Sequence, residues 1–448
     1  FSFVSQYFPN GKSITDLKTV LNNIGNALIG AAFIAFSLIM FSMQINIERM
    51  PHGLFFKYGK DFSILAMFVA TLISGIAVCL SSLTLHDERY LLLSLSLGFW
   101  GTTFTIILII QAYERTLFLI NPVKQLNILL QSIERDLKSW SYRSEKAKPL
   151  LNDGKSQLSQ SDFKHDIKKT IYMALNPHGK QLAQNAIDHA FSFFHRYAKR
   201  GDYVVSAHAL QVIGAINELY IQHKGQTFYY DHPWFENPFS SDELVTHSLE
   251  NLRKGTIIAL ARKDEQQLIQ ILQTFTLLIN IYLQIDYSNT QAPKSHAKLA
   301  ASYLAEAVTS ILPHDMTDVV MEGLRLMGQS ASASFQIGKF TDTIPLIDKI
   351  GLITVAGIVN KKQYPIIMIG MQQFNKLTLG LLKSRSNDLS FASKTLKKNV
   401  SLICTTFLRV PVNSFELIHS TYLGPYYSFQ QSHLRPMLGE LANWVISQ

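Results

Sequence analysis

Charged side chains are scarce in this sequence. Of its 448 residues, 41 are Lys or Arg and 32 are Asp or Glu, so 16% are charged while 47% are hydrophobic. Soluble globular domains carry about 25% charged residues. A deficit of this size, in a chain long enough for two or three domains, indicates that part of the chain lies in a membrane.

Cysteine is also nearly absent, since only Cys79 and Cys404 are present. Two cysteines cannot build the disulfide framework of a small secreted protein or a cysteine-rich zinc site. Both are therefore expected to be small hydrophobic residues of the interior. We expect neither a metal nor a cofactor.

Short catalytic motifs are missing as well: no G-x-S-x-G, H-E-x-x-H or G-x-G-x-x-G occurs. Residues 10–13 (NGKS) end like a phosphate-binding P-loop, but Gln6 stands where that loop needs its first glycine. Adjacent His-Asp pairs point about 100° apart on a helix, which gives neither relay nor metal geometry. The basic run 195–200 is expected to be a solvated helix end. We therefore expect that the protein is not an enzyme.

Three long runs contain no charged residue: 24–45, 62–85 and 90–113. A helix of about 20 apolar residues crosses the ~30 Å hydrocarbon core of a bilayer. Core helices of soluble proteins are seldom this long and this free of charge. We predict three transmembrane helices over these runs, packed as a bundle in a lipid bilayer.

Basic residues predict the orientation of these helices. The first connection contains Arg49, Lys57 and Lys60, whereas the second contains only Arg89. Lys and Arg concentrate in cytoplasmic loops. We therefore expect residues 1–23 to lie outside the cytoplasm, and the first connection and the C-terminal part to lie inside, in a bacterial inner membrane.

The first connection is short, aromatic and basic. Pro51 is expected to turn the chain, while Arg49, Lys57 and Lys60 hold lipid phosphates at a cytoplasmic elbow.

The net charge of +9 is unevenly distributed, because residues 1–112 contribute only +1. A basic C-terminal part suits a domain under an anionic membrane surface. A nucleic-acid partner would need a dense basic stripe or a binding motif, and the sequence has neither.

The residues after the third run show helical rather than strand periodicity, which predicts an all-α fold. Residues 114–138 continue as a helix that leaves the membrane, with a kink near Pro122. Residues 139–162 are polar and contain Asp-Gly, which predicts a linker. Residues 163–448 then form a cytoplasmic α-helical domain.

A short pattern with small residues at both ends recurs in this domain. Small residues on a helix let a neighbouring helix approach closely, as in stacked helix pairs of the HEAT type. Ordinary helix packing with chance similarity explains the pattern equally well. The four copies are residues 209–214, 323–328, 351–356 and 370–375.

Polar residues around the first run recur every three or four positions and so share one helical face. An unsatisfied amide is costly in lipid, so this face should meet protein or water. Two interpretations stay open: a packed helix interface, or a pore lining in which two Phe rings form apolar constrictions. The face comprises Asn22, Asn26, Gly30, Phe33, Ser37, Phe41 and Gln44.

A pore would require a homo-oligomer, because three helices cannot enclose a water path. No Asp, Glu, Lys, Arg or His lies inside the three runs. That argues against a proton relay and is compatible with a neutral, gated pore. Small-residue stripes in the second and third runs are predicted helix contacts; they comprise Ser63, Ala66, Ala70, Ser74, Ala77 and Ser81, and Ser94, Gly98, Gly101 and Thr105.

Residues 14–85 contain a recognisable order of features. A span ends in Phe-Ser-hydrophobic, a Gln and a short segment with Pro and basic residues follow, and then come an Asp and a span with an early Phe. These are Phe36, Ser37, Gln44, Pro51, Lys57, Lys60, Asp61 and Phe68. In this order the chain resembles a family of predicted bacterial integral membrane proteins of unknown function. The resemblance implies one more span upstream, although the cytoplasmic SPGxNDP-like motif of that family is absent here.

We therefore predict an oligomeric, channel-like inner-membrane protein whose cytoplasmic helical domain gates it or docks a protein partner. The alternative is a membrane-anchored helical scaffold or sensor that binds a protein partner without conducting.

Overall fold

The structure is a computed structural model, and it describes nine stretches of the chain. Regular structure in these stretches is helical, with fourteen α-helices; Phe228 and Tyr287 form an isolated bridge. The all-α prediction is confirmed for this part of the chain. The stretches are residues 11–47, 62–82, 91–151, 166–229, 242–287, 293–339, 341–359, 364–383 and 390–409.

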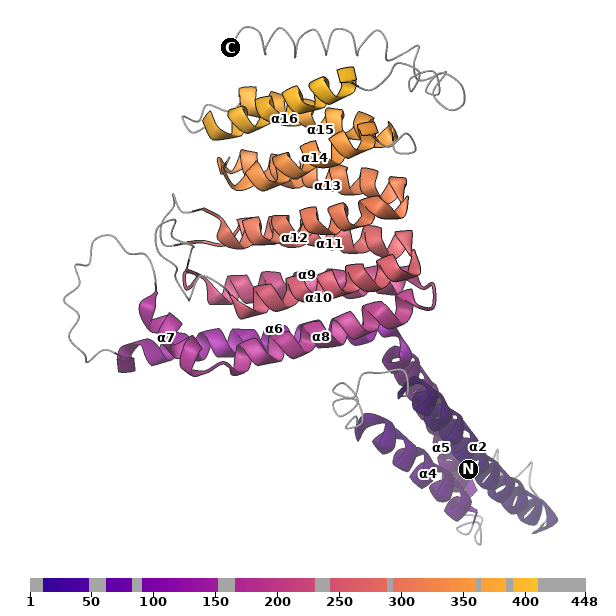
Figure 1. The fold of residues 1–448 in the computed structure, drawn as a ribbon. Coiled ribbons are helices and arrows are strands. Elements are labelled where there is room, and N and C mark those ends of the chain that lie inside the picture. The colour runs from indigo at the N-terminus through magenta and orange to yellow at the C-terminus, as the bar shows by residue number, and fades with distance from the viewer. Residues whose placement is uncertain are drawn as a thin grey trace, which may run out of the picture. The chain divides into compact units, whose positions relative to one another are not determined.

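The chain divides into two compact units, residues 1–129 and 130–448, which we call the membrane unit and the helical unit. The membrane unit contains α2 (Gly11–Ile47), α4 (Phe62–Ser81) and α5 (Leu91–Ile120), each packed against the other two (Figure 1). These three helices, and α9 of the helical unit, are long and apolar enough to cross a membrane. The chain therefore has the character of a membrane protein.

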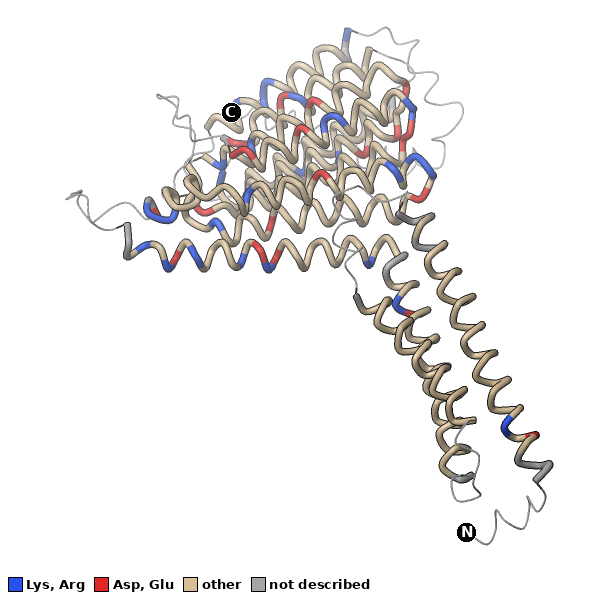
Figure 2. Tube along the Cα trace, turned by 90° about the horizontal axis from the view of Figure 1, so that it is seen from below, with Lys and Arg blue, Asp and Glu red and all other residues tan. Residues whose placement is uncertain are grey.

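Large apolar side chains face outward from all three helices of the membrane unit. Examples are Ile34, Ile73 and Trp100, which are 66%, 62% and 67% exposed. Figure 2 shows charged residues only toward the ends of these helices. Exposed apolar side chains in this number need lipid or protein around them.

Small residues hold α4 against α5. Ser74 Oγ donates to the Gly101 carbonyl at 3.0 Å, and Thr105 Oγ1 donates to Ser74 Oγ at 2.9 Å. A Cβ on Gly101 would lie 2.6 Å from Val78 Cγ2, so only glycine allows this approach. The predicted helix contact is confirmed at Ser74, Gly101 and Thr105.

The helix that follows α5 begins at a proline. α6 spans Pro122–Ala147, and the break between it and α5 falls at Asn121. Proline is favoured at a first helical position because it has no N–H to satisfy there. The Asn121 side-chain oxygen caps α6 by accepting from the backbone N–H groups of Val123 (3.0 Å) and Lys124 (3.3 Å). The predicted kink is confirmed, and the boundary between the two units lies inside α6.

The polar linker predicted over residues 139–162 is wrong as far as residue 151. Residues 139–147 belong to α6, and Lys148–Leu151 form a 3-10 turn. Tyr142, Arg143 and Lys146 are on the exposed side of an amphipathic helix, whereas Trp140 and Ser144 are buried. The Trp140 ring lies 2.5 Å from where a Cβ on Gly179 would be. Polar composition alone cannot tell such a helix from a loop. Residues 152–165 lie outside the described residues.

The helical unit stacks its helices in two layers (Figure 1). In one layer α8, α10, α12, α14 and α16 pack in succession, and in the other α9, α11, α13 and α15 do. This is an arrangement of stacked helix pairs, in which each pair buries its apolar faces against the next. The bounds are α7 Ile167–Leu175, α8 His178–Ala198, α9 Tyr203–Lys224, α10 Glu243–Arg262, α11 Glu265–Leu283, α12 Ser295–Ile311, α13 Thr317–Gln336, α14 Ile344–Val359, α15 Tyr364–Lys383 and α16 Ser390–Arg409.

Glycines of the recurring pattern lie where these helices touch. A Cβ on Gly214 would lie 2.5 Å from a carbon of Leu277, and one on Gly323 would lie 2.5 Å from a carbon of Val308. The prediction that these small residues permit close helix approach is confirmed at both positions.

A polar cluster around Asn217 of α9 lies within the helical unit. Asn217 is fully buried, and its Nδ2 donates to the Ile213 carbonyl at 2.9 Å. Its Oδ1 accepts from Tyr282 Oη at 2.8 Å and from Ser248 Oγ at 3.2 Å. Such pairing removes most of the cost of burying the amide. In this unit α8 and α11 pack against α9.

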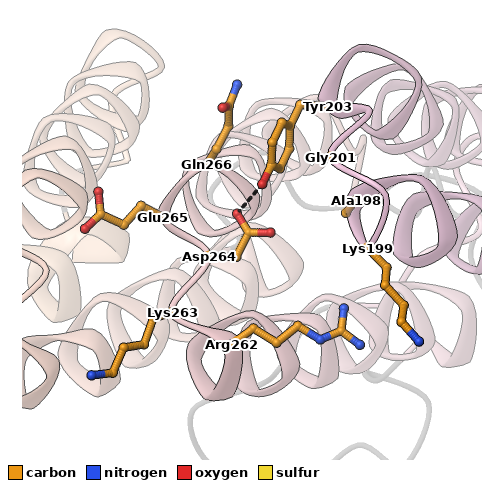
Figure 3. Close-up of a pocket in the computed structure, with 9 residues that line it drawn as sticks. All are labelled: Ala198, Lys199, Gly201, Tyr203, Arg262, Lys263, Asp264, Glu265 and Gln266. Atoms are coloured by element: carbon orange, nitrogen blue, oxygen red, sulfur yellow. Dashed lines mark hydrogen bonds between the residues drawn. The ribbon is translucent and has the colours of Figure 1, made fainter.

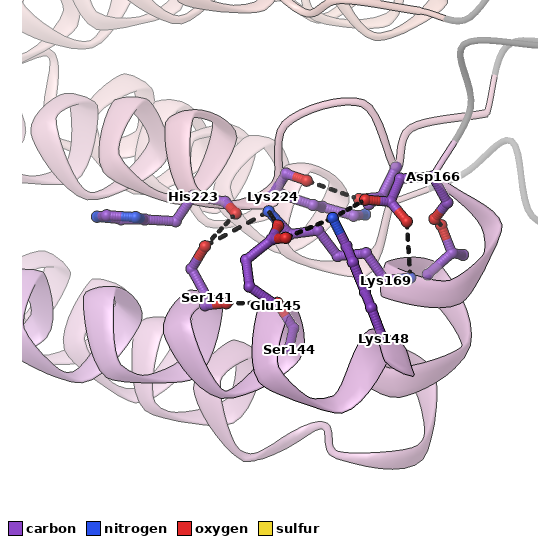
Figure 4. A network of polar contacts seen from close by, with 10 residues as sticks. Ser141, Ser144, Glu145, Lys148, Asp166, Lys169, His223 and Lys224 are labelled. Carbon is purple, nitrogen blue, oxygen red and sulfur yellow. Dashed lines mark hydrogen bonds and ion pairs between the residues drawn. The ribbon is translucent and has the colours of Figure 1, made fainter. Parts of the chain in front are cut away.

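The end of α6 is joined to α7 and α9 by a polar network (Figure 4). Lys148 Nζ lies 2.5 Å from both Glu145 Oε2 and Asp166 Oδ2, and Ser141 Oγ donates to the His223 carbonyl at 3.2 Å. Burial raises the pKa of Asp166, but its hydrogen bonds to Lys148 and to the first turn of α7 outweigh burial and lower that pKa below its ordinary value. The network therefore stabilises the C-terminal end of α6 within the helical unit.

Candidate functional site

The polar face predicted on the first span is an exposed face of α2. The opposite side of the helix packs inward, with Leu21, Ala32 and Ile39 buried. The two aromatic members of the polar face, Phe33 and Phe41, are 55% and 60% exposed. We call this face the α2 stripe; its exposed members are Asn22, Asn26, Gly30, Phe33, Ser37, Phe41 and Gln44.

Two members of the α2 stripe touch α4 at its edge. Cys79 Sγ lies 3.7 Å from Asn26 Oδ1, and the rings of Phe33 and Phe68 meet edge to face with centroids 5.7 Å apart. A Cβ on Gly30 would have no described atom within 4 Å. The α2 stripe is therefore not the surface through which α2 packs on its neighbours within one chain.

The exposed polar face continues upstream of the predicted residues. Thr15 and Thr19 are exposed, and they precede Asn22 by the same steps of four and three. Thr19 Oγ1 donates to the Thr15 carbonyl at 2.9 Å, which satisfies the hydroxyl within the helix. The helical spacing would have found both residues, but the predicted span began at residue 24.

The chemistry of the α2 stripe is neutral. Its polar groups are amides and hydroxyls, which bind water and exchange hydrogen bonds without carrying charge. Phe33 and Phe41 are eight positions apart, or about 12 Å along a helix at 1.5 Å per residue. The stripe thus combines an amide-bearing part around Asn22 and Asn26 with a part that carries two apolar rings.

The second predicted site, the cytoplasmic elbow, lies outside the described residues. It comprises Arg49, Pro51, Lys57 and Lys60.

The helical unit has an open pocket of about 730 Å³ where the α8–α9 turn meets the α10–α11 turn (Figure 3). Tyr203 Oη donates to Asp264 Oδ1 at 3.1 Å, and the same oxygen accepts from the Gln267 backbone N–H at 3.0 Å. We call this cavity the turn pocket. Its lining residues are Ala198, Lys199, Gly201, Tyr203, Arg262, Lys263, Asp264, Glu265 and Gln266.

Three exposed cations line the turn pocket, Lys199, Arg262 and Lys263, and Arg200 follows Lys199 in the chain. None of them forms an ion pair with a carboxylate of the described stretches. Burial, and next the positive charge of Arg262, lower the pKa of His195 to about 4. The region is therefore electropositive without a contribution from this imidazole at neutral pH. Sequence reasoning missed the pocket because its two turns are distant in the chain.

In the described stretches, no group of three or more His, Cys, Asp or Glu side chains is placed to hold a metal ion.

No protein-family profile, no curated protein and no solved structure matches this chain. The family resemblance of residues 14–85 therefore stays a prediction.

Proposed function

We propose that several copies of the chain associate in a bacterial inner membrane and that their α2 stripes line a neutral, water-containing path. In this proposal the helical unit is cytoplasmic and gates the path or docks the protein that does. The observation that carries it is the exposure of the whole stripe, from Asn22 to Gln44, in a membrane-spanning helix.

The energetic reason concerns the amides. An amide left unpaired in hydrocarbon costs several kcal/mol, so Asn22 and Asn26 would not remain against lipid chains. Among the described residues of one chain, the amide of Asn26 has only a weak contact, with the Cys79 thiol. A second copy of α2, or water held between copies, supplies the missing partners.

Phe33 and Phe41 are the proposed constrictions. Apolar rings in a narrow path close it by excluding water, which needs no charged gate. Removal of a ring should therefore make the path easier to wet.

Conductance in a planar bilayer tests the channel. Phe33→Ala is expected to increase the open probability or the leak of the purified oligomer. Ile34→Ala is the matched control, because Ile34 is the next residue, is 66% exposed and lies off the stripe. The proposal fails if the oligomer shows no conductance under voltage, tension or ligand and Phe33→Ala opens nothing.

The second candidate is a membrane-anchored scaffold or sensor. The observation in its favour is exposed apolar side chains toward the end of α15 and the start of α16: Leu379, Leu382 and Phe391 are 49%, 61% and 63% exposed. If the helical unit binds a protein there, Leu382→Ser with Phe391→Ser should abolish capture of that protein. Capture should survive replacement of the three spans by unrelated ones, and conductance should be absent.

A further inference from the structure

The turn pocket places cations from two distant turns on one side. In Figure 3 the side chains of Lys199 and Arg262 extend toward the same side, whereas Glu265 and Lys263 extend toward the other. The two turns are held together by the bond from Tyr203 to Asp264, residues 61 positions apart, and by Gln270 Nε2, which donates to the Tyr203 carbonyl at 2.8 Å. The two bonds therefore fix the backbone positions from which the Lys199 and Arg262 side chains extend.

The nearby carboxylates offset part of this positive charge and leave a net positive charge. Asp202 accepts from the Val205 backbone N–H at 3.2 Å at the start of α9, and Asp264 caps α11. Both carboxylates are thus directed at helix ends. The cations in or next to the two turns are Lys199, Arg200, Arg262 and Lys263, and the carboxylates are Asp202, Asp264 and Glu265.

Cations at the ends of α8 and α10 also complement the helix dipoles, which requires no ligand. A dipole alone does not explain why Lys199 and Arg262 of different helices share one side of a pocket. Lys199 and Arg262 form no ion pair within the described stretches. Their N–H donors are therefore available to a ligand.

We infer that the turn pocket binds a phosphate-bearing anion, with Arg262 and Lys199 as its principal contacts. A guanidinium presents paired N–H donors that match two phosphate oxygens, and an ammonium adds a compact charge. A volume of about 730 Å³ admits a small phosphorylated molecule or the headgroup of an anionic lipid. This inference is independent of the channel, because it concerns residues of the helical unit alone.

Binding to the purified full-length chain in a neutral detergent tests it. The two probes are inorganic pyrophosphate and a short-chain phosphatidylglycerol below its micelle concentration, each titrated by calorimetry at constant ionic strength. Saturable binding of at least one probe is expected. Lys199→Gln with Arg262→Gln should weaken that binding at least tenfold.

Two controls separate this site from general charge effects. Lys397→Gln removes an exposed cation of α16 and should change the affinity less than twofold. Lys263→Gln, from the same turn but the other side of the pocket, should lose less than Arg262→Gln. Lys199 and Arg262 are exposed, so the melting temperature of the double variant should match that of the unmodified chain.

Binding of pyrophosphate alone would identify a soluble phosphate ligand, and binding of phosphatidylglycerol alone a lipid headgroup. Binding of both would show that the phosphate group itself is recognised. All three results support the inference if the double variant loses the binding. Binding of neither probe, or equal binding by the double variant, overturns it.

Discussion

Gly25 of α2 lies directly against Cys79 of α4. A Cβ on Gly25 would sit 2.3 Å from Cys79 Sγ and 2.9 Å from its backbone nitrogen. Movement of the thiol alone could not relieve that clash, because the backbone of α4 is also too close. The crossing of α2 and α4 therefore depends on glycine at this position.

Gly25→Val is expected to destabilise the membrane unit by about 1–3 kcal/mol, the usual cost of forcing extra volume into a packed contact. A lower melting temperature of the purified protein, dissociated to single chains in detergent, would show it. Gly30→Val is the matched control, since a Cβ at Gly30 meets open space.

The same control variant probes the α2 stripe. Gly30→Val should leave the stability of a single chain unchanged but alter the oligomer, because Gly30 lies in the middle of the stripe. Chemical cross-linking and the mass of the detergent complex measure this change in the oligomer.

For the Gly25→Val prediction, equal melting temperatures of the variant and the unmodified chain would contradict the described α2–α4 contact.

Thr105→Val removes the hydroxyl that donates to Ser74 and keeps the shape of the side chain. Hydrogen bonds between membrane helices contribute about 0.6 kcal/mol on average and at most about 2 kcal/mol. We expect a loss in that range in reversible unfolding measured in bicelles. A double-mutant cycle with Ser74→Ala should show that the two losses are not additive.

The buried carboxylate of Asp242 makes the stability of the helical unit pH-dependent. Burial raises the pKa of Asp242, but the ion pair with Lys224 and the hydrogen bonds to the start of α10 outweigh it, so the folded pKa lies below the ordinary value of 3.8. The unfolded chain then binds the proton more readily than the folded chain. The stabilisation is complete above that ordinary value and is lost as the pH falls through the folded pKa.

Asp242→Asn should remove most of this pH dependence. It should also cost about 3–5 kcal/mol at neutral pH, because it leaves the largely buried ammonium of Lys224 without its counter-charge. Melting curves between pH 7 and pH 3 check both points. A variant whose stability falls as steeply with acid as that of the unmodified chain would show that other carboxylates dominate.

Lys263 ends α10 with a φ of 55°, in the left-handed region that favours glycine. Lys263→Gly removes the steric cost of that conformation, about 1–2 kcal/mol. Part of this gain is lost, because glycine raises the conformational entropy of the unfolded chain. We expect a net gain of about 0.5–1 kcal/mol in the free energy of unfolding. Asp315→Gly, at a φ of 56°, should give a similar gain outside the turn pocket.

The membrane unit was largely predictable from the sequence because its signals are local. A run without charge identifies a span wherever its neighbours lie, and steps of three and four place Asn22 and Ser37 on one face of any helix. The contact of Ser74 with Thr105 was accessible for the same reason, since small residues mark close helix approach in membranes.

The helical unit was predictable only in outline. Helical periodicity predicts its helices but not which of them touch. The bond of Tyr203 to Asp264 joins residues 61 positions apart, and neither residue belongs to a motif. The error over residues 139–147 has a different cause. Ser141, Ser144 and Glu145 are typical of a loop in composition, but Ser144 is buried, and Ser141 and Glu145 contact α9 and α7.

The two-layer stack has a consequence for how the helical unit comes apart. Each helix packs mainly against its neighbours in the stack, so no single core holds all the helices together. Such arrays lose structure stepwise from an end, at a free-energy cost set by one interface at a time. Among the described helices, we expect amide hydrogens of α16, the last in chain order, to exchange with solvent sooner than those of α9 and α11 around Asn217.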